Sequence, residues 1–326
     1  MKALAALLCS LLALAACAQD DRRWVDAEVS FTDDGLTIHG TYRHEENAAA
    51  GPAALLLSES GATDRNGDNA VAGPIGNMRQ LAELLSDRDV ASLRYDKIGT
   101  GKTGLGPYAQ RPTEVVSAVY TSGARAAVRY LAEQPGTDKA RLSVYALGEG
   151  TVHAMSLATD TAPGAPKIHS LGLFQPLPGR YLDIITNRVR ANASPQALAT
   201  WQAAVDQVRS TGTVAPNLPE GLGALLNPGN VKAVVEADKI DPLRLAAELP
   251  VGMPVLLTCS DADEQATCTS VQPLAKALEH TALTLVELEG VNHVLREDPT
   301  DNVANYASQD PISPQVVQAL DGFVGK

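Results

Sequence analysis

The chain has 326 residues, of which 45% are hydrophobic and 20% are charged, a composition typical of a folded globular protein. Its formal net charge of −12 leaves no basic excess to neutralise phosphates, so we expect no nucleic-acid partner. Aromatic residues make up only 4% of the chain, which argues against a surface of stacked rings for binding bases or sugars. The length suits one large domain with an insertion.

The first 16 residues have the features of a signal peptide. Lys2 supplies the positive start, and residues 3–16 form an apolar run too short to cross a bilayer as a mature helix. The run ends in the letters Leu-Ala-Ala-Cys, which resemble a bacterial lipobox with Cys17 as the lipid-modified N-terminus; an ordinary small-x-small cleavage site also fits here. We therefore expect removal of residues 1–16, a tether over 17–24, and an exported protein. It is either anchored at the outer face of the cell membrane through an acylated Cys17 or secreted.

Two cysteines remain in the mature chain beyond Cys17. Cys259 and Cys268 lie close together in the sequence, and an exported chain with one such pair most simply forms a disulfide. A metal site is disfavoured because no further Cys or His lies near this pair. We expect neither a metal nor a cofactor.

Apolar strand-like runs alternate with helix-like runs along most of the chain. Strands are expected at residues 25–31, 36–42, 53–57, 90–93, 142–147, 168–174, 254–258 and 283–288, and helices at 78–85, 113–133, from about 150, and at 316–324. Asp33-Asp34-Gly35 between the first two strands is a hairpin signal. Such alternation indicates an α/β fold with a mostly parallel sheet and crossover helices.

The pattern changes between residues 179 and 249. Here helical spacing recurs without intervening strands, at residues 181–189, 195–208, 218–226 and 231–237. We therefore predict a core formed by residues 25–178 and 250–326, and a helical cap formed by residues 179–249.

The run from Leu142 to Met155 carries the most informative motif. A strand-like segment ends in Ala-Leu-Gly-Glu-Gly, with Gly148 at its centre, and a helix-like segment follows. This layout resembles the Gly-x-Ser-x-Gly nucleophile elbow of the α/β-hydrolase superfamily. Four further segments, in order, resemble that superfamily's exported bacterial serine hydrolases with helical caps. They are the loop from Ser60 to Gly67, the turn Arg-Tyr-Asp-Lys ending at Lys97, the segment Asp261-Ala262-Asp263 after an apolar strand, and Asn-His-Val-Leu around His293.

The resemblance implies an α/β-hydrolase fold and a set of site residues. The superfamily's order of nucleophile, acid and histidine is similar here to Gly148, Asp263 and His293, with Asp261 a rival for the acid. In that reading His293 is the base and Asp263 orients it. Ser60 and Glu149 are the implied oxyanion-hole positions.

Two positions depart from the superfamily's pattern. Gly148 has no side chain and cannot form an acyl-enzyme, and Glu59 stands where these proteins usually have glycine, so that it opposes an oxyanion or blocks the pocket. The hydroxyls of Thr151 and Ser60 are nearby but not at the apex of the turn. In the loop after Glu59, Asp64 and Arg65 are expected to pair and hold its shape.

These observations leave two hypotheses for function. One is a protein related to carboxylic-ester and acyl hydrolases that is weak or inactive as a serine hydrolase because its triad is incomplete. The other is a non-catalytic ligand-binding or interaction lipoprotein of the cell envelope. Either implies a small acyl or ester-like ligand, and no sequence feature sets the oligomeric state.

Overall fold

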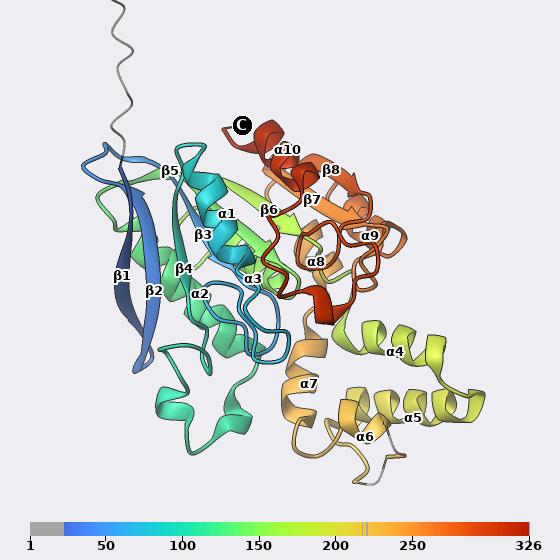
Figure 1. The fold of residues 1–326 in the computed structure, drawn as a ribbon. Coiled ribbons are helices and arrows are strands. Elements are labelled where there is room, and N and C mark those ends of the chain that lie inside the picture. The colour runs from blue at the N-terminus through green and yellow to red at the C-terminus, as the bar shows by residue number, and fades with distance from the viewer. Residues whose placement is uncertain (1–22, 217, 220, 326) are drawn as a thin grey trace, which may run out of the picture.

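The computed structural model describes residues 23–216, 218–219 and 221–325. The expected signal peptide, Cys17 and all but the end of the tether lie outside the described residues. The fold is built on one eight-stranded sheet with strand order β1-β2-β4-β3-β5-β6-β7-β8 (Figure 1). Its strands are β1 (Trp24–Asp33), β2 (Leu36–Glu45), β3 (Gly51–Leu57), β4 (Ala91–Tyr95), β5 (Thr137–Leu147), β6 (Ser170–Phe174), β7 (Pro254–Ser260) and β8 (Ala282–Leu288).

The predicted hairpin joins the two antiparallel strands at one edge of the sheet. Asp33 pairs with Leu36, which leaves a two-residue turn of Asp34 and Gly35. Their φ angles of 44° and 79° belong to the tight turn whose twist matches that of the flanking strands, and such angles favour Asp and Gly. The remaining neighbours from β4 to β8 pair in parallel, so the predicted mostly parallel sheet is confirmed.

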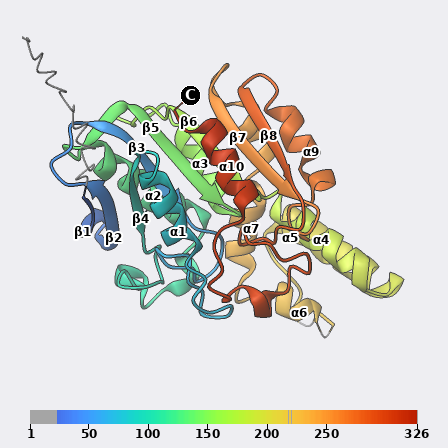
Figure 2. The same cartoon turned by 45° about the horizontal axis from the view of Figure 1, so that its top comes forward.

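Helices cover both faces of the sheet, as crossover connections require. α1 (Asn77–Ser86) and α10 (Pro314–Phe323) bury their apolar stripes on one face, where Met78 and Leu320 join one hydrophobic cluster. The other face is covered by α2 (Ser117–Ala132), α3 (Gly150–Ala158), α8 (Pro242–Ala247) and α9 (Cys268–Ala277). Figure 2 shows α10 and α9 on opposite sides of β7 and β8.

Four helices between β6 and α8 form a separate unit beside the sheet (Figure 1). They are α4 (Tyr181–Asn192), α5 (Pro195–Thr211), α6 (Leu222–Leu225) and α7 (Val231–Lys239), and they pack around a small core of their own centred on the fully buried Trp201. The buried carboxylate of Asp238 ties this cap together, because it accepts hydrogen bonds from Arg180, Arg209 and the backbone of Leu182.

Two helices are shorter than predicted. The helix expected over residues 113–133 begins only at Ser117, because a short 3₁₀ turn at Pro112–Glu114 and the extended backbone of Val116 precede it. In the piece expected over 218–226, the described residues are helical only at α6, where Gly221 with φ 85° precedes the first turn. No helix in the described part of the chain combines the length and the apolar character needed to cross a membrane.

Candidate active site

The carboxyl ends of the parallel strands place the sequence-predicted residues along one edge of the sheet. Glu59 follows β3, Lys97 follows β4, Gly148 follows β5, Asp263 follows β7 and His293 follows β8. Ligand sites in open parallel sheets lie at this edge, because the loops that leave adjacent strands meet there. The site is therefore assembled from segments far apart in the sequence.

Gly148 forms the sharp turn between β5 and α3. Its φ of +55° lies in the left-handed region that glycine adopts without strain, and its N–H donates to the carbonyl of Phe174 at 3.1 Å. The next glycine, Gly150, is needed for a close approach, since a Cβ there would lie 2.7 Å from the carbonyl oxygen of Leu57. The turn thus has the tight geometry of a nucleophile elbow without a nucleophile.

Asp263 and His293 are in direct contact. Nδ1 of His293 lies 2.8 Å from Oδ2 of Asp263, and both side chains are buried. The other carboxylate oxygen of Asp263 accepts the N–H groups of Gln265 and Ala266, which fixes its orientation. The rival acid, Asp261, instead accepts the N–H of Gly290.

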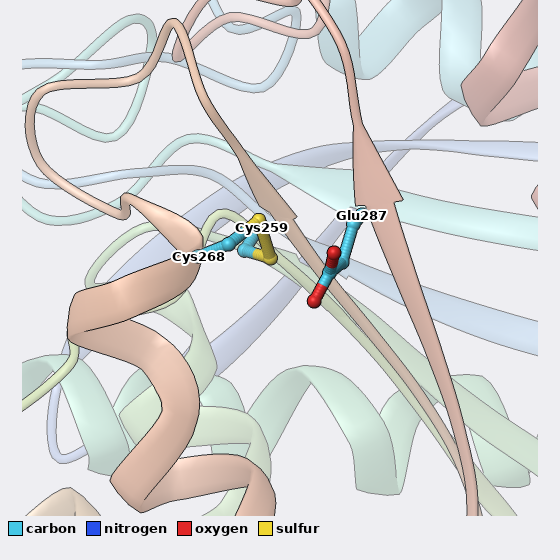
Figure 3. A group of neighbouring side chains, drawn as sticks. All are labelled: Cys259, Cys268 and Glu287. Carbon is cyan, nitrogen blue, oxygen red and sulfur yellow. A yellow bond between two sulfur atoms is a disulfide. The ribbon is translucent and has the colours of Figure 1, made fainter.

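The predicted disulfide between Cys259 and Cys268 is confirmed, and it closes the loop that carries Asp263. Figure 3 shows it beside Glu287 on the neighbouring strand. These three residues are the one group in the described chain whose potential ligand atoms lie close enough to hold a metal, within 4.8 Å of one another. Because thiolates bind metals and both sulfurs are bonded to each other, the oxidised pair offers no such ligands.

Glu59 lies beside Gly148, against the space into which a serine side chain would project. Its Oε2 is 3.2 Å from Nε2 of His293, the atom that would accept a proton from a nucleophile. A Cβ added to Gly148 would lie 3.2 Å from Cβ of Glu59 and 3.2 Å from Nε2 of His293. A carboxylate that no triad requires has therefore taken the position beside the histidine.

The two carboxylates hold His293 in its protonated form. Burial by itself lowers the pKa of the imidazole, but the charge and hydrogen bond of Asp263, followed by those of Glu59, outweigh it and raise the pKa to about 10. An imidazolium has no free lone pair and cannot take a proton from a hydroxyl. At neutral pH the raised pKa therefore favours the protonated imidazole.

Lys97 supports the backbone of Glu59, a role that the sequence did not indicate. Its ammonium group donates to the carbonyl oxygen of Glu59, and burial lowers its pKa to about 8 against the opposing charges of Glu149 and Glu59. Because Lys97 closely follows the strand that ends at Tyr95, the sequence places it at the edge of the sheet where the strands end. The sequence contains no signal for the direction of its side chain.

The predicted pair of Asp64 and Arg65 is wrong. Arg65 instead forms ion pairs with Asp96 and Glu28, each at 2.8 Å. Asp64 accepts the N–H groups of Asn66 and Asp68, which closes its own turn. The side chains of adjacent residues in a tight turn point in different directions, so Asp64 does not pair with Arg65. Asp96 follows the neighbouring strand β4 and lies against the guanidinium group of Arg65.

The two residues implied for the oxyanion hole, Ser60 and Glu149, lie in different loops: Ser60 follows β3, and Glu149 lies between β5 and α3. Ser60 is exposed, and its carbonyl accepts the hydroxyl of Thr63. Glu149 directly follows Gly148 and precedes α3, so its N–H is at the helix start, where backbone donors lack helical partners. The hydroxyl of Thr151 donates to the carbonyl oxygen of Gly148 at 2.6 Å.

The sequence matches no model of a known protein family, and no curated protein is a significant match to it. Comparison of structures does find relatives in fold. An esterase from Pyrococcus furiosus aligns with a TM-score of 0.54 and 17% identity over 93% of this chain and 92% of its own. The esterase Est1E from Butyrivibrio proteoclasticus with bound ferulic acid aligns at 0.56 and 16%, over 86% and 96%. A dienelactone hydrolase from Anabaena variabilis aligns at 0.52 and 13%, over 92% and 98%.

The chain therefore has the α/β-hydrolase fold, and the solved structures that it resembles include ester and acyl hydrolases.

Proposed function

We propose that this protein uses the α/β-hydrolase fold to bind a small acyl or ester-like ligand and does not perform serine-hydrolase chemistry. The observation that carries the proposal is the contact between Glu59 and His293 beside Gly148. Three requirements of the serine mechanism fail together. Gly148 offers no hydroxyl at the apex of the turn, the raised pKa of His293 favours its protonated form, and the carboxylate of Glu59 lies 3.2 Å from the Nε2 atom that would act as the base.

We further propose that the protein works outside the cytoplasm, attached to the cell membrane through an acylated Cys17. The apolar run before Cys17 and the disulfide between Cys259 and Cys268 support export, because disulfides persist in oxidising compartments. In this setting the protein is a binding lipoprotein of the cell envelope.

The proposal predicts negligible turnover of p-nitrophenyl acetate, butyrate and octanoate by the wild type. We expect rates well below the roughly 10³–10⁴-fold over water that a hydrolase without its triad keeps through its oxyanion hole, because the carboxylate of Glu59 opposes the developing negative charge. Steady-state absorbance assays on wild type and His293→Ala make the test. Turnover by the wild type that His293→Ala abolishes would show an atypical hydrolase and overturn the proposal.

A further inference from the structure

The start of β1 and the candidate active site lie at opposite edges of the sheet. β1 is antiparallel to β2, and β2 is antiparallel to β4, so β1 runs in the same direction as the parallel strands. Trp24 at the start of β1 therefore lies at the amino edge of the sheet, whereas Gly148 and His293 follow strands at the carboxyl edge. Figure 1 shows the start of β1 and the cap at opposite ends of the molecule.

The chain that links the expected lipid anchor to β1 is short. Cys17 precedes Trp24 by seven residues, which span at most about 25 Å when fully extended. β1 is ten residues long, so its two ends lie about 30 Å apart. An acylated Cys17 at the lipid surface therefore cannot let the molecule stand on its carboxyl edge, because the start of β1 would then lie beyond the reach of the linking chain.

The surface around Trp24 consists of three segments, residues 23–25, 45–51 and 136–141, which we call the amino-edge surface. The N–H of Glu46 donates to the carbonyl of Arg23, and the N–H of Gly51 donates to the carbonyl of Gly136, so the segments lie side by side. Trp24 is half-buried, and three consecutive alanines, Ala48, Ala49 and Ala50, are exposed. Tryptophan is enriched where proteins meet the headgroups of a bilayer, because its ring is apolar and its N–H is polar.

The charges of the amino-edge surface cancel. It contains three basic residues, Arg23, Lys139 and Arg141, and three acidic ones, Glu45, Glu46 and Asp138, in a chain whose formal net charge is −12. Two of the arginines form ion pairs inside the surface, with Glu46 at 3.5 Å and with Asp138 at 2.8 Å. Anionic headgroups repel an acidic surface, so this neutral part of an acidic protein is the part that they tolerate.

We propose that the amino-edge surface lies against the lipid headgroups of the membrane that holds Cys17, with the exposed part of the Trp24 indole at the interface and the carboxyl edge of the sheet turned to water. This inference rests on the proposed function, because it takes the acylated Cys17 from it. It adds the orientation of the protein and the source of the ligand. An acyl or ester-like ligand reaches Glu59 and His293 from the aqueous side and not from the bilayer.

The two tryptophans of the chain report this orientation. Trp24 belongs to the amino-edge surface, and Trp201 is fully buried in the cap. The test uses the full chain, purified with its anchor and reconstituted into vesicles of phosphatidylcholine and phosphatidylglycerol, with and without lipids brominated in the upper part of their acyl chains. Trp201→Phe leaves Trp24 as the emitter, and Trp24→Phe leaves Trp201 as the matched control. We expect brominated lipid to quench the emission of Trp24 and to leave that of Trp201 unchanged.

Two results would overturn the inference. Quenching of Trp201, with or without quenching of Trp24, would place the cap at the membrane. Quenching of neither tryptophan would show that the amino-edge surface does not reach the lipids. If Trp201→Phe does not fold, a bimane label on Ala49→Cys, compared with one on Gln196→Cys in α5, gives the same readout, because both positions are exposed.

Intact-mass spectrometry of the purified protein separates this inference from the proposed function. Absence of acyl chains on Cys17 removes the membrane attachment in the proposed function, and the inference falls with it. Acylated protein whose Trp24 is not quenched removes the inference alone and leaves the proposed function standing.

Discussion

The double variant Glu59→Gly/Gly148→Ser is expected to hydrolyse p-nitrophenyl butyrate at least about 10³-fold faster than the wild type. The serine supplies the missing hydroxyl at a turn that already has the required backbone. Removing the carboxylate of Glu59 frees Nε2 of His293, lowers the pKa of the imidazole and takes a negative charge away from the oxyanion. Initial rates over a range of substrate concentrations measure the gain.

The single variants should show little of this gain. Gly148→Ser alone places its Cβ 3.2 Å from Cβ of Glu59, and the carboxylate still holds the histidine protonated. Glu59→Gly alone has no nucleophile. The matched control is Glu59→Gly/Gly148→Ala, which reproduces the backbone strain at φ +55° without a hydroxyl. Equal activity in this control and in the serine variant would show that the elbow does not support catalysis.

The second large effect concerns the stability that His293 contributes. The folded state raises the pKa of His293 from 6.5 to about 10, so the folded protein holds a proton that the unfolded chain releases. This contribution is fully present below pH 6.5 and is lost as the pH rises to about 10, by up to about 1.4 kcal/mol per pH unit. The difference in unfolding free energy between wild type and His293→Gln, measured by denaturant titration, should fall over that window.

The comparison with His293→Gln is needed because Lys97 acts in the opposite direction. Burial lowers the pKa of Lys97 to about 8, so its neutral form is favoured in the folded state and its effect on stability improves as the pH rises above 8. Both proteins contain Lys97, and its effect largely cancels in the difference. A difference that stays constant from pH 6.5 to 10 would show that His293 is neutral, and would remove the ion pair with Glu59 from the account.

Much of the fold follows from local sequence signals. Backbone geometry dictates a recognisable residue pattern in three of its elements. These are the turn of Asp34 and Gly35, the strand that ends before Gly148, and the apolar stripe of α1. Once the parallel strands are placed in order, their carboxyl ends meet. The pairing of Asp263 with His293 was implied by the resemblance to α/β-hydrolases, and the meeting of the strand ends is the physical reason that the two residues share one edge of the sheet.

The details of the site depend on directions that no periodic pattern encodes. The sequence marked Glu59 as unusual, but its contact with His293 depends on how the loop after β3 turns. The partner of Arg65 was misassigned because Asp96 is distant in sequence and adjacent in space. The raised pKa of His293 follows from two carboxylates that only folding brings together.

The most direct test of the account is the reaction of the wild-type protein with a fluorophosphonate probe, followed by intact-mass spectrometry. The double variant Glu59→Gly/Gly148→Ser serves as the positive control, because it carries a serine beside a freed His293. The account predicts no added mass on the wild type and one adduct on the double variant. A stoichiometric adduct on the wild type, mapped to Ser60 or Thr151, would show that another hydroxyl has taken over as nucleophile and would contradict the account.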